Sequence, residues 1–239
     1  NVQPKKLSLT RLGYQSGDRV SFKREIHFNG TDLRDWENLT DVEIRISPRN
    51  GWLVNYLPLE TIDTSRRFAT YGIDSTYTVM PGDEYVVENA MDHLDEAGEW
   101  VFHSGDKRVY LYSTSDPTNM DIRAPYLQEF IRIEGAQDAQ PARFLRFQGM
   151  TFRHGLRDTW KDGDHGLQHD WEMYDKGNAV LRFRHAEDCL VEGCTFEASS
   201  GTVVRLDLHC HRVTVKDSIF AHLGGTGILL SGYAPGTYY

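Results

Sequence analysis

The sequence is poor in cysteine and lacks any long hydrophobic run. Its three cysteines, Cys189, Cys194 and Cys210, lie close together and include no C-x-x-C pair. This spacing fits no zinc pattern, so we expect buried packing residues, with a disulfide or a metal role as the alternative. The longest apolar stretches are strand-sized, far short of the roughly 20 residues that span a bilayer. The sequence therefore predicts no membrane span.

Basic residues are also in deficit. The chain has 26 Lys and Arg against 35 Asp and Glu, a formal net charge of -9. Proteins that bind nucleic acid through its phosphates usually carry a basic excess. We therefore expect no nucleic-acid partner.

What the sequence does have, over residues 1–125, is alternating β-type runs separated by turn dipeptides. Residues 42–46 and 85–87 are two such runs, and Asn50-Gly51 is one of the turns. This pattern predicts a β-rich subdomain. We expect one short helix at 88–94 and a hairpin over 99–113.

From about residue 126 the sequence repeats itself. Residues 178–201 align without a gap on residues 202–225, a period of 24 residues. The alignment pairs Phe196 with Phe220, Val191 with Val215, and His185 with His209. A period of this size with two or three short β-runs indicates a solenoid of three-stranded coils, since propeller blades and leucine-rich repeats need other patterns.

An earlier coil is interrupted by an insertion. Residues 147–152 match residues 191–196 at an offset of 44, which is about 20 residues more than one period. The excess predicts a loop insertion at about 156–177. Residues 126–239 are thus expected to form the coils and that loop.

Within each coil, alternate residues should point inward. Val204, Leu206 and Leu208 alternate in one expected strand, and Ile228 and Leu230 follow one coil later. Terminal coils usually carry a polar cap, and nothing after Leu230 resembles one. We expect a fragment that ends mid-solenoid, with the remaining part of the same polypeptide completing it.

One segment carries a family resemblance. Residues 85–100, with Val87-Glu88-Asn89-Ala90 and Gly98-Glu99-Trp100, resemble a signature of right-handed parallel β-helix proteins. Residues 109–112 resemble the aromatic strand that follows it, and residues 225–233 resemble a later coil of these proteins. The group includes the fucosidase and xylanase-type enzymes of glycoside hydrolase family 141.

The resemblance implies an all-β, right-handed parallel β-helix with an N-terminal or inserted β-sandwich-like subdomain. It also implies a secreted or periplasmic glycosidase that acts on a plant or algal polysaccharide. It implies no site residue here, because the family's catalytic acids match no position of this sequence. Trp100 is expected to pack the hairpin onto the solenoid.

Outward residues of the coils are the candidates for chemistry. If Leu206 and Leu208 face inward, then Arg205, Asp207 and His209 face outward. Asp207 is the candidate catalytic acid, base or nucleophile, because glycoside hydrolysis uses carboxyl groups. The alternative is a solvated polar face with surface ion pairs.

Neighbouring coils extend this face. Tyr233 lies at an outward place in the next coil, and His185 does so in the preceding one. If the preceding strand slips by one residue, it presents Arg182 and Arg184 instead. Arginines there would pair with carboxylate or sulfate groups of a glycan.

The predicted loop offers a second group of candidates. Trp160 and Trp171 would stack on sugar rings. Asp162 and Asp164 faintly resemble a calcium loop whose other ligands are missing. We therefore expect no required cofactor and assign no metal ligands, and calcium is left open.

Three functions are consistent with this sequence. The first is a glycoside hydrolase that uses outward carboxylates on the β-helix face. The second is a polysaccharide lyase or epimerase, which needs an acidic sugar and a base beside its carboxyl group. The third is a non-catalytic glycan-binding or adhesive solenoid.

Overall fold

The structure is a computed structural model of the chain, and it describes residues 7–8, 23–47, 54–76, 78–80, 82–136, 140–159 and 179–231. Strands dominate this part, and its helices are short 3-10 turns at Leu39–Asp41, Met91–His93 and Pro117–Asn119. None of the described helices has the length and apolar character needed to cross a membrane. The fold is all-β, and the chain divides into two compact units, the first reaching Asp121 and the second starting at Ile122.

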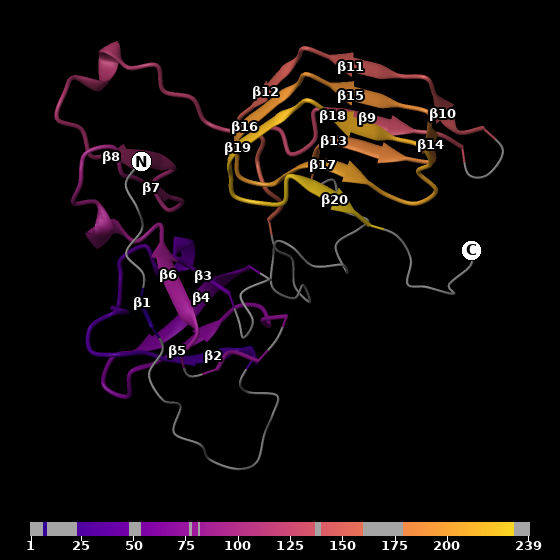
Figure 1. The fold of residues 1–239 in the computed structure, drawn as a ribbon. Coiled ribbons are helices and arrows are strands. Elements are labelled where there is room, and N and C mark those ends of the chain that lie inside the picture. The colour runs from indigo at the N-terminus through magenta and orange to yellow at the C-terminus, as the bar shows by residue number, and fades with distance from the viewer. Residues whose placement is uncertain are drawn as a thin grey trace. The chain divides into compact units, whose positions relative to one another are not determined.

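The first unit is built on a six-stranded antiparallel sheet with the order β1-β6-β3-β4-β5-β2 (Figure 1). Its strands are Leu7–Ser8 (β1), Glu25–His27 (β2), Glu43–Ile46 (β3), Asn55–Asp63 (β4), Phe68–Tyr71 (β5) and Glu84–Glu88 (β6). The predicted runs 42–46 and 85–87 are neighbours in it, with Ile44 paired to Val87. Ile44 and Leu57 are fully buried at the centre, so the apolar runs supply this unit's core.

The helix predicted at 88–94 is wrong for most of its length. Strand β6 continues to Glu88, and only Met91–His93 form a 3-10 turn. Asn89 between them has φ +64°, a left-handed conformation that a right-handed helix does not admit.

The predicted hairpin is present. Trp100–His103 (β7) pairs with Arg108–Leu111 (β8) in antiparallel register. The described residues of this unit form the six-stranded sheet and this two-stranded ribbon. The second full sheet that a β-sandwich requires is not among them.

The second unit is a stack of parallel sheets. Its strands are Ile131–Glu134 (β9), Ala142–Arg143 (β10), Arg146–Gln148 (β11), Thr151–Arg153 (β12), Ala179–Arg184 (β13), Ala186–Glu187 (β14), Leu190–Glu192 (β15), Thr195–Ser199 (β16), Thr202–Leu206 (β17), Thr214–Lys216 (β18), Ile219–Leu223 (β19) and Ile228–Leu230 (β20). The sheets have the orders β20-β17-β13-β9, β10-β14, β11-β15-β18 and β12-β16-β19. Each successive pass of the chain therefore adds one strand to several sheets, as the orange and yellow strands of Figure 1 show.

The strand register confirms the sequence repeat. Val191 pairs with Val215 and Phe196 with Phe220, one period apart. Phe152 pairs with Phe196 at the longer predicted offset. The insertion predicted at 156–177 lies mostly outside the described residues.

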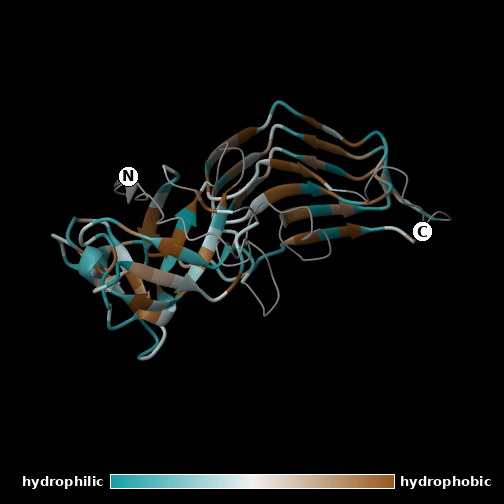
Figure 2. Ribbon diagram, turned by 90° about the horizontal axis from the view of Figure 1, so that it is seen from below, coloured by the Kyte–Doolittle hydropathy of each residue, from teal (hydrophilic) through white to brown (hydrophobic). Residues whose placement is uncertain are grey.

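A column of phenylalanine rings runs through the core of this unit. The centroids of Phe152 and Phe196 are 4.9 Å apart and those of Phe196 and Phe220 are 5.1 Å apart, with nearly parallel planes. In Figure 2 hydrophobic positions recur along successive strands of the stack. Equal residues at equal register thus pack as ladders, because neighbouring strands lie about 4.8 Å apart.

Candidate functional site

Three arginines occupy one register position on adjacent parallel strands. Arg132 of β9 pairs with Arg182 of β13, which pairs with Arg205 of β17. We call these three residues the arginine ladder. The residues on either side of each arginine in the strand point to the opposite face, where Phe183 and Val204 belong to the apolar core.

The offset between β13 and β17 is one residue shorter than the repeat. Leu181 pairs with Val204, so the slipped alignment, which brings Arg182 beside Arg205, is the one that forms. The 24-residue spacing is restored at His185, whose ring stacks on that of His209 with centroids 5.3 Å apart. The change from 23 to 24 residues is accommodated at Asp207 and Leu208. There Asp207 N–H donates to Phe183 O, and His185 N–H donates to Leu208 O.

Asp207 lies between two members of the arginine ladder. Nε of Arg182 donates to its Oδ2, and Nε of Arg205 donates to its Oδ1 at 2.5 Å. Arg182 is 3% exposed, Arg205 0% and Asp207 5%. Charge-assisted pairs of this kind are strong, and each partner compensates the cost of burying the other.

Further acidic groups surround the ladder. Nε of Arg132 donates to Glu129 Oε1 at 2.6 Å, and Nη1 of Arg182 lies 4.0 Å from Glu129 Oε2. The hydrogen bond to Glu129 raises the pKa of Arg132. Burial lowers the pKa of Arg205, and the charge of Asp207 opposes that shift.

An open depression of about 410 Å³ adjoins Asp207. It is lined by Leu206, Asp207, Leu208, His209, Cys210, His211, Leu230 and Ser231. Its lining thus combines two histidines, a serine and an aspartate with apolar residues. Burial raises the pKa of Cys210 to about 11, so its thiol is uncharged near neutrality and a poor nucleophile.

The structure brings several predicted site residues together and corrects their setting. Arg182, Arg205 and Asp207 form one cluster, and Arg184 lies beside it with Nε 3.9 Å from Glu134 Oε1. The prediction that these side chains form a solvent-open face is wrong for Arg182, Arg205 and Asp207, which are buried. His209 is exposed and lines the depression. The predicted contacts Trp160, Trp171 and Tyr233 lie outside the described residues.

Outward positions of three other sheets carry a charge pattern that the sequence analysis did not predict. Glu187, Glu192 and Glu197 recur every five residues on one pass of the chain. Their partners on the adjacent passes are Arg143, Arg212, Gln148, Lys216 and Arg153. The hydrogen bond from Lys216 lowers the pKa of Glu192. Each of these glutamates is therefore paired with a basic or amide side chain from a neighbouring pass.

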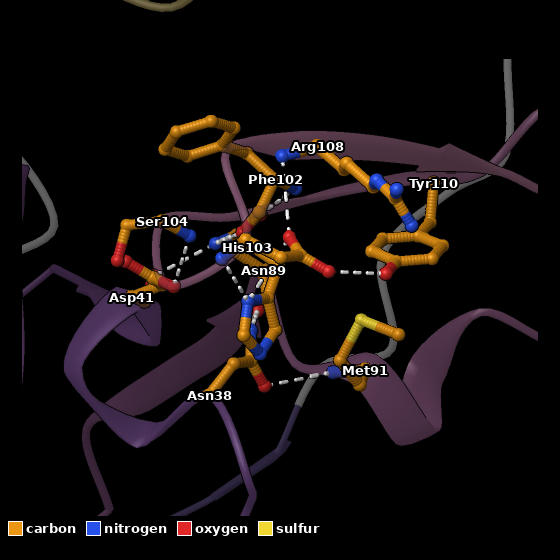
Figure 3. A network of polar contacts seen from close by, with 10 residues as sticks. Asn38, Asp41, Asn89, Met91, Phe102, His103, Ser104, Arg108 and Tyr110 are labelled. Carbon is orange, nitrogen blue, oxygen red and sulfur yellow. Dashed lines mark hydrogen bonds and ion pairs between the residues drawn. The ribbon is translucent and has the colours of Figure 1, made fainter.

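The hairpin signature of the first unit forms a polar network (Figure 3). The side-chain amide of Asn89 accepts from Phe102 N–H at 2.7 Å and donates to Phe102 O at 2.8 Å and Asp41 O at 2.9 Å. Oδ2 of Asp41 accepts from Ser104 N–H at 2.8 Å. Glu99 accepts from the amides of Asp95 and Glu96. The polar residues of this segment therefore hold the hairpin in place, and the Asn89 amide bonds both backbone groups of Phe102 in β7.

Within the first unit, Trp100 is not a packing residue. Its side chain is 62% exposed, whereas its neighbour Val101 is buried. Alternation along β7 explains this, since only one face of the ribbon lies against the unit.

Replacing Asn89 with Ala should loosen the hairpin by about 2–4 kcal/mol. The change removes three hydrogen bonds, and it leaves a side chain with a β-carbon in the left-handed region. Hydrogen exchange of the amides of Trp100–His103 and Arg108–Leu111 in the full chain measures the effect. Asn89→Gly is the control, because glycine tolerates the backbone conformation and should recover about 1 kcal/mol. Unchanged exchange in both variants would mean that the amide does not anchor the hairpin.

No three His, Cys, Asp or Glu side chains of the described part gather as metal ligands would. The calcium-like Asp162 and Asp164 lie outside that part. Comparison with protein-family models, with curated proteins and with solved structures finds no match for this chain.

Proposed function

We propose that the second unit is a right-handed parallel β-helix, and that the chain belongs to a secreted or periplasmic glycoside hydrolase. Its substrate in this proposal is a plant or algal polysaccharide. Parallel sheets that gain one strand from each pass of the chain support the β-helix. The resemblance of residues 85–100 to family 141 glycoside hydrolases supports the enzyme class.

The observation that carries the proposal is the depression beside the arginine ladder. A sugar ring there meets the hydroxyl of Ser231, the exposed imidazole of His209 and apolar surface from Leu230. Sugars have hydroxyl groups and apolar C–H faces, and such mixed sites suit both. Asp207 is among the residues that line this depression, and its carboxylate lies in the buried cluster beside it.

In this proposal Asp207 is the catalytic carboxylate that faces the developing positive charge. Both of its oxygens accept guanidinium hydrogen bonds and its side chain is buried, so it suits a charge-stabilising role better than that of a proton donor or a nucleophile. Hydrolysis requires a second carboxyl group. We assign Glu129 to this role, because Arg182 lies between it and Asp207. Arg132 binds only its Oε1, so Oε2 can carry the proton.

The arginine ladder also favours a second candidate, a lyase or epimerase that acts on an acidic glycan. Guanidinium groups neutralise the carboxylate of an acidic sugar, which makes the adjacent proton easier to remove. Product absorbance in the ultraviolet separates the two reactions, because only a lyase creates a double bond.

The test is a screen of the full chain against polygalacturonate, xylan, fucosylated glycans and sulfated algal glycans. New reducing ends without ultraviolet absorbance are expected. Asp207→Asn and Glu129→Gln should each lower the rate at least about 100-fold. His209→Ala, a change at an exposed side chain, should mainly raise KM.

Asp188→Asn is the matched control, because Asp188 is a partly exposed carboxylate paired with Arg212 away from the ladder. It should leave turnover unchanged. Absorbing products would replace the hydrolase with the lyase. Binding without turnover on every glycan would leave a non-catalytic glycan-binding solenoid. Full activity of both Asp207→Asn and His209→Ala would remove this depression as the site.

A further inference from the structure

One face of the β7–β8 ribbon is apolar and exposed. Trp100 pairs with Leu111 and Phe102 with Val109, so these four side chains share a face. Trp100 is 62% exposed, Phe102 42% and Val109 59%. The opposite face carries the buried Val101 and the ring pair His103–Tyr110. We call the exposed side the aromatic platform.

The platform is held rigidly. An isolated two-stranded hairpin is only marginally stable in water. Here the Asn89 amide binds both backbone groups of Phe102, and Asp41 binds the amide of Ser104, as Figure 3 shows. At the turn, Asp106 accepts from Arg108 N–H and from the Tyr110 hydroxyl. A ligand that contacts the platform therefore loses little affinity to the ordering of the ribbon.

The size of the platform selects the kind of ligand. An aromatic side chain offers about 150–250 Å², so exposures of 62% and 42% leave roughly 200 Å² of ring surface on Trp100 and Phe102. A stable protein interface needs about 800 Å² from each partner. The platform is much too small for that, and a flat ribbon does not enclose a small apolar molecule as a pocket would.

We propose that the aromatic platform is a secondary binding site for a neutral stretch of polysaccharide, whose pyranose rings stack on Trp100. This inference rests on the proposed glycan-processing function and adds a binding site in the other unit. Aromatic faces suit the apolar C–H faces of sugars, while ring hydroxyls stay in water or meet the polar turn at Asp106 and Arg108. The net charge of -9 disfavours an anionic glycan at a site without a cluster of cations.

The test is affinity electrophoresis of the full chain through gels that contain neutral xylan or neutral mixed-linkage glucan, with titration calorimetry on xylohexaose. Trp100→Ala should weaken binding about tenfold or more, the effect expected when one ring–ring stack is lost. Trp100→Phe keeps a ring and should recover most of the affinity. Tyr126→Ala removes a ring that is 86% exposed in the second unit and is the matched control.

The proposal is overturned if Trp100→Ala binds like the unmodified chain, if Tyr126→Ala loses as much affinity, or if neither neutral glycan is bound. Turnover is measured on the same variants, so the two proposals fail separately. Turnover that persists without Trp100-dependent binding removes the platform alone. Trp100-dependent binding without any turnover removes the hydrolase and keeps the platform.

Discussion

Asp207→Asn is expected to destabilise the second unit by about 3–5 kcal/mol. The carboxylate neutralises Arg182 and Arg205, which are almost completely buried. An amide has the same shape but no charge, and its NH₂ group would face guanidinium donors. Two positive charges about one strand spacing apart would then remain out of water without a shared counter-ion. Urea-dependent hydrogen exchange of β13 and β17 amides in the full chain measures the loss.

A variant that removes the whole cluster separates charge imbalance from lost packing. Arg182→Met, Arg205→Met and Asp207→Leu combined should cost far less than Asp207→Asn alone, because replacing a buried ion cluster with apolar groups is often neutral or stabilising. Asp188→Asn, at an exposed ion pair, should change stability by less than about 1 kcal/mol. Equal losses in the single and triple variants would contradict a dominant role for charge. The measured stability of Asp207→Asn also decides what its lower turnover means. Lower turnover in a folded variant reflects chemistry, whereas lower turnover in an unfolded variant reflects the loss of structure.

The stack of parallel strands was predictable because its signal is periodic. A ladder needs like residues at one register position, so Phe196 and Phe220 appear in the sequence at the repeat distance and stack in the structure. The one-residue slip of β13 was also predictable, since Leu181 and Phe183 suit a core better than Arg182 does. The position of the extra residue, at Asp207–Leu208, was not, because the alignment of residues 178–201 on 202–225 has no gap that marks it.

The burial of the arginine ladder could not be read from the repeat. Alternation assigns Arg205 to the outward face, and the expectation that outward means solvated failed there. Parallel sheets are often covered on both faces. Glu129, the acidic partner of Arg182, precedes the residues that align in the repeat, so no periodic pattern predicts its position. By contrast, the five-residue spacing of Glu187, Glu192 and Glu197 is visible in the sequence and could have predicted their outward positions.

The hairpin signature illustrates a different limit. Its turn residues predicted the ribbon correctly, whereas helix-favouring residues after Glu88 predicted a helix that does not form. The side chain of Asn89 decides the local conformation, because it binds the backbone of Phe102, thirteen positions further along the chain. Such a contact is long-range relative to any propensity window, so propensity alone gives the wrong element.

Phe196→Ala is expected to destabilise the second unit by about 3–5 kcal/mol, the usual cost of removing a buried aromatic ring. Phe196 is fully buried and stacks on Phe152 on one side and Phe220 on the other. The cavity would therefore interrupt the column, and two ring pairs would lose their additional stabilisation. Hydrogen exchange of β16 and its neighbours β12 and β19 reports the change.

Phe220→Ala is the matched control, because it removes the same ring at the half-buried end of the column. Among the described residues Phe220 stacks on Phe196 alone, so the loss should be about half as large. Protection should then fall mainly in β19, whereas Phe196→Ala should expose amides in all three strands. Equal costs for the two variants would mean that ladder position does not control ring stabilisation. A larger cost for Phe196 would tie the stability of each pass to the side chains stacked above and below it, as nearest-neighbour coupling in a repeat requires.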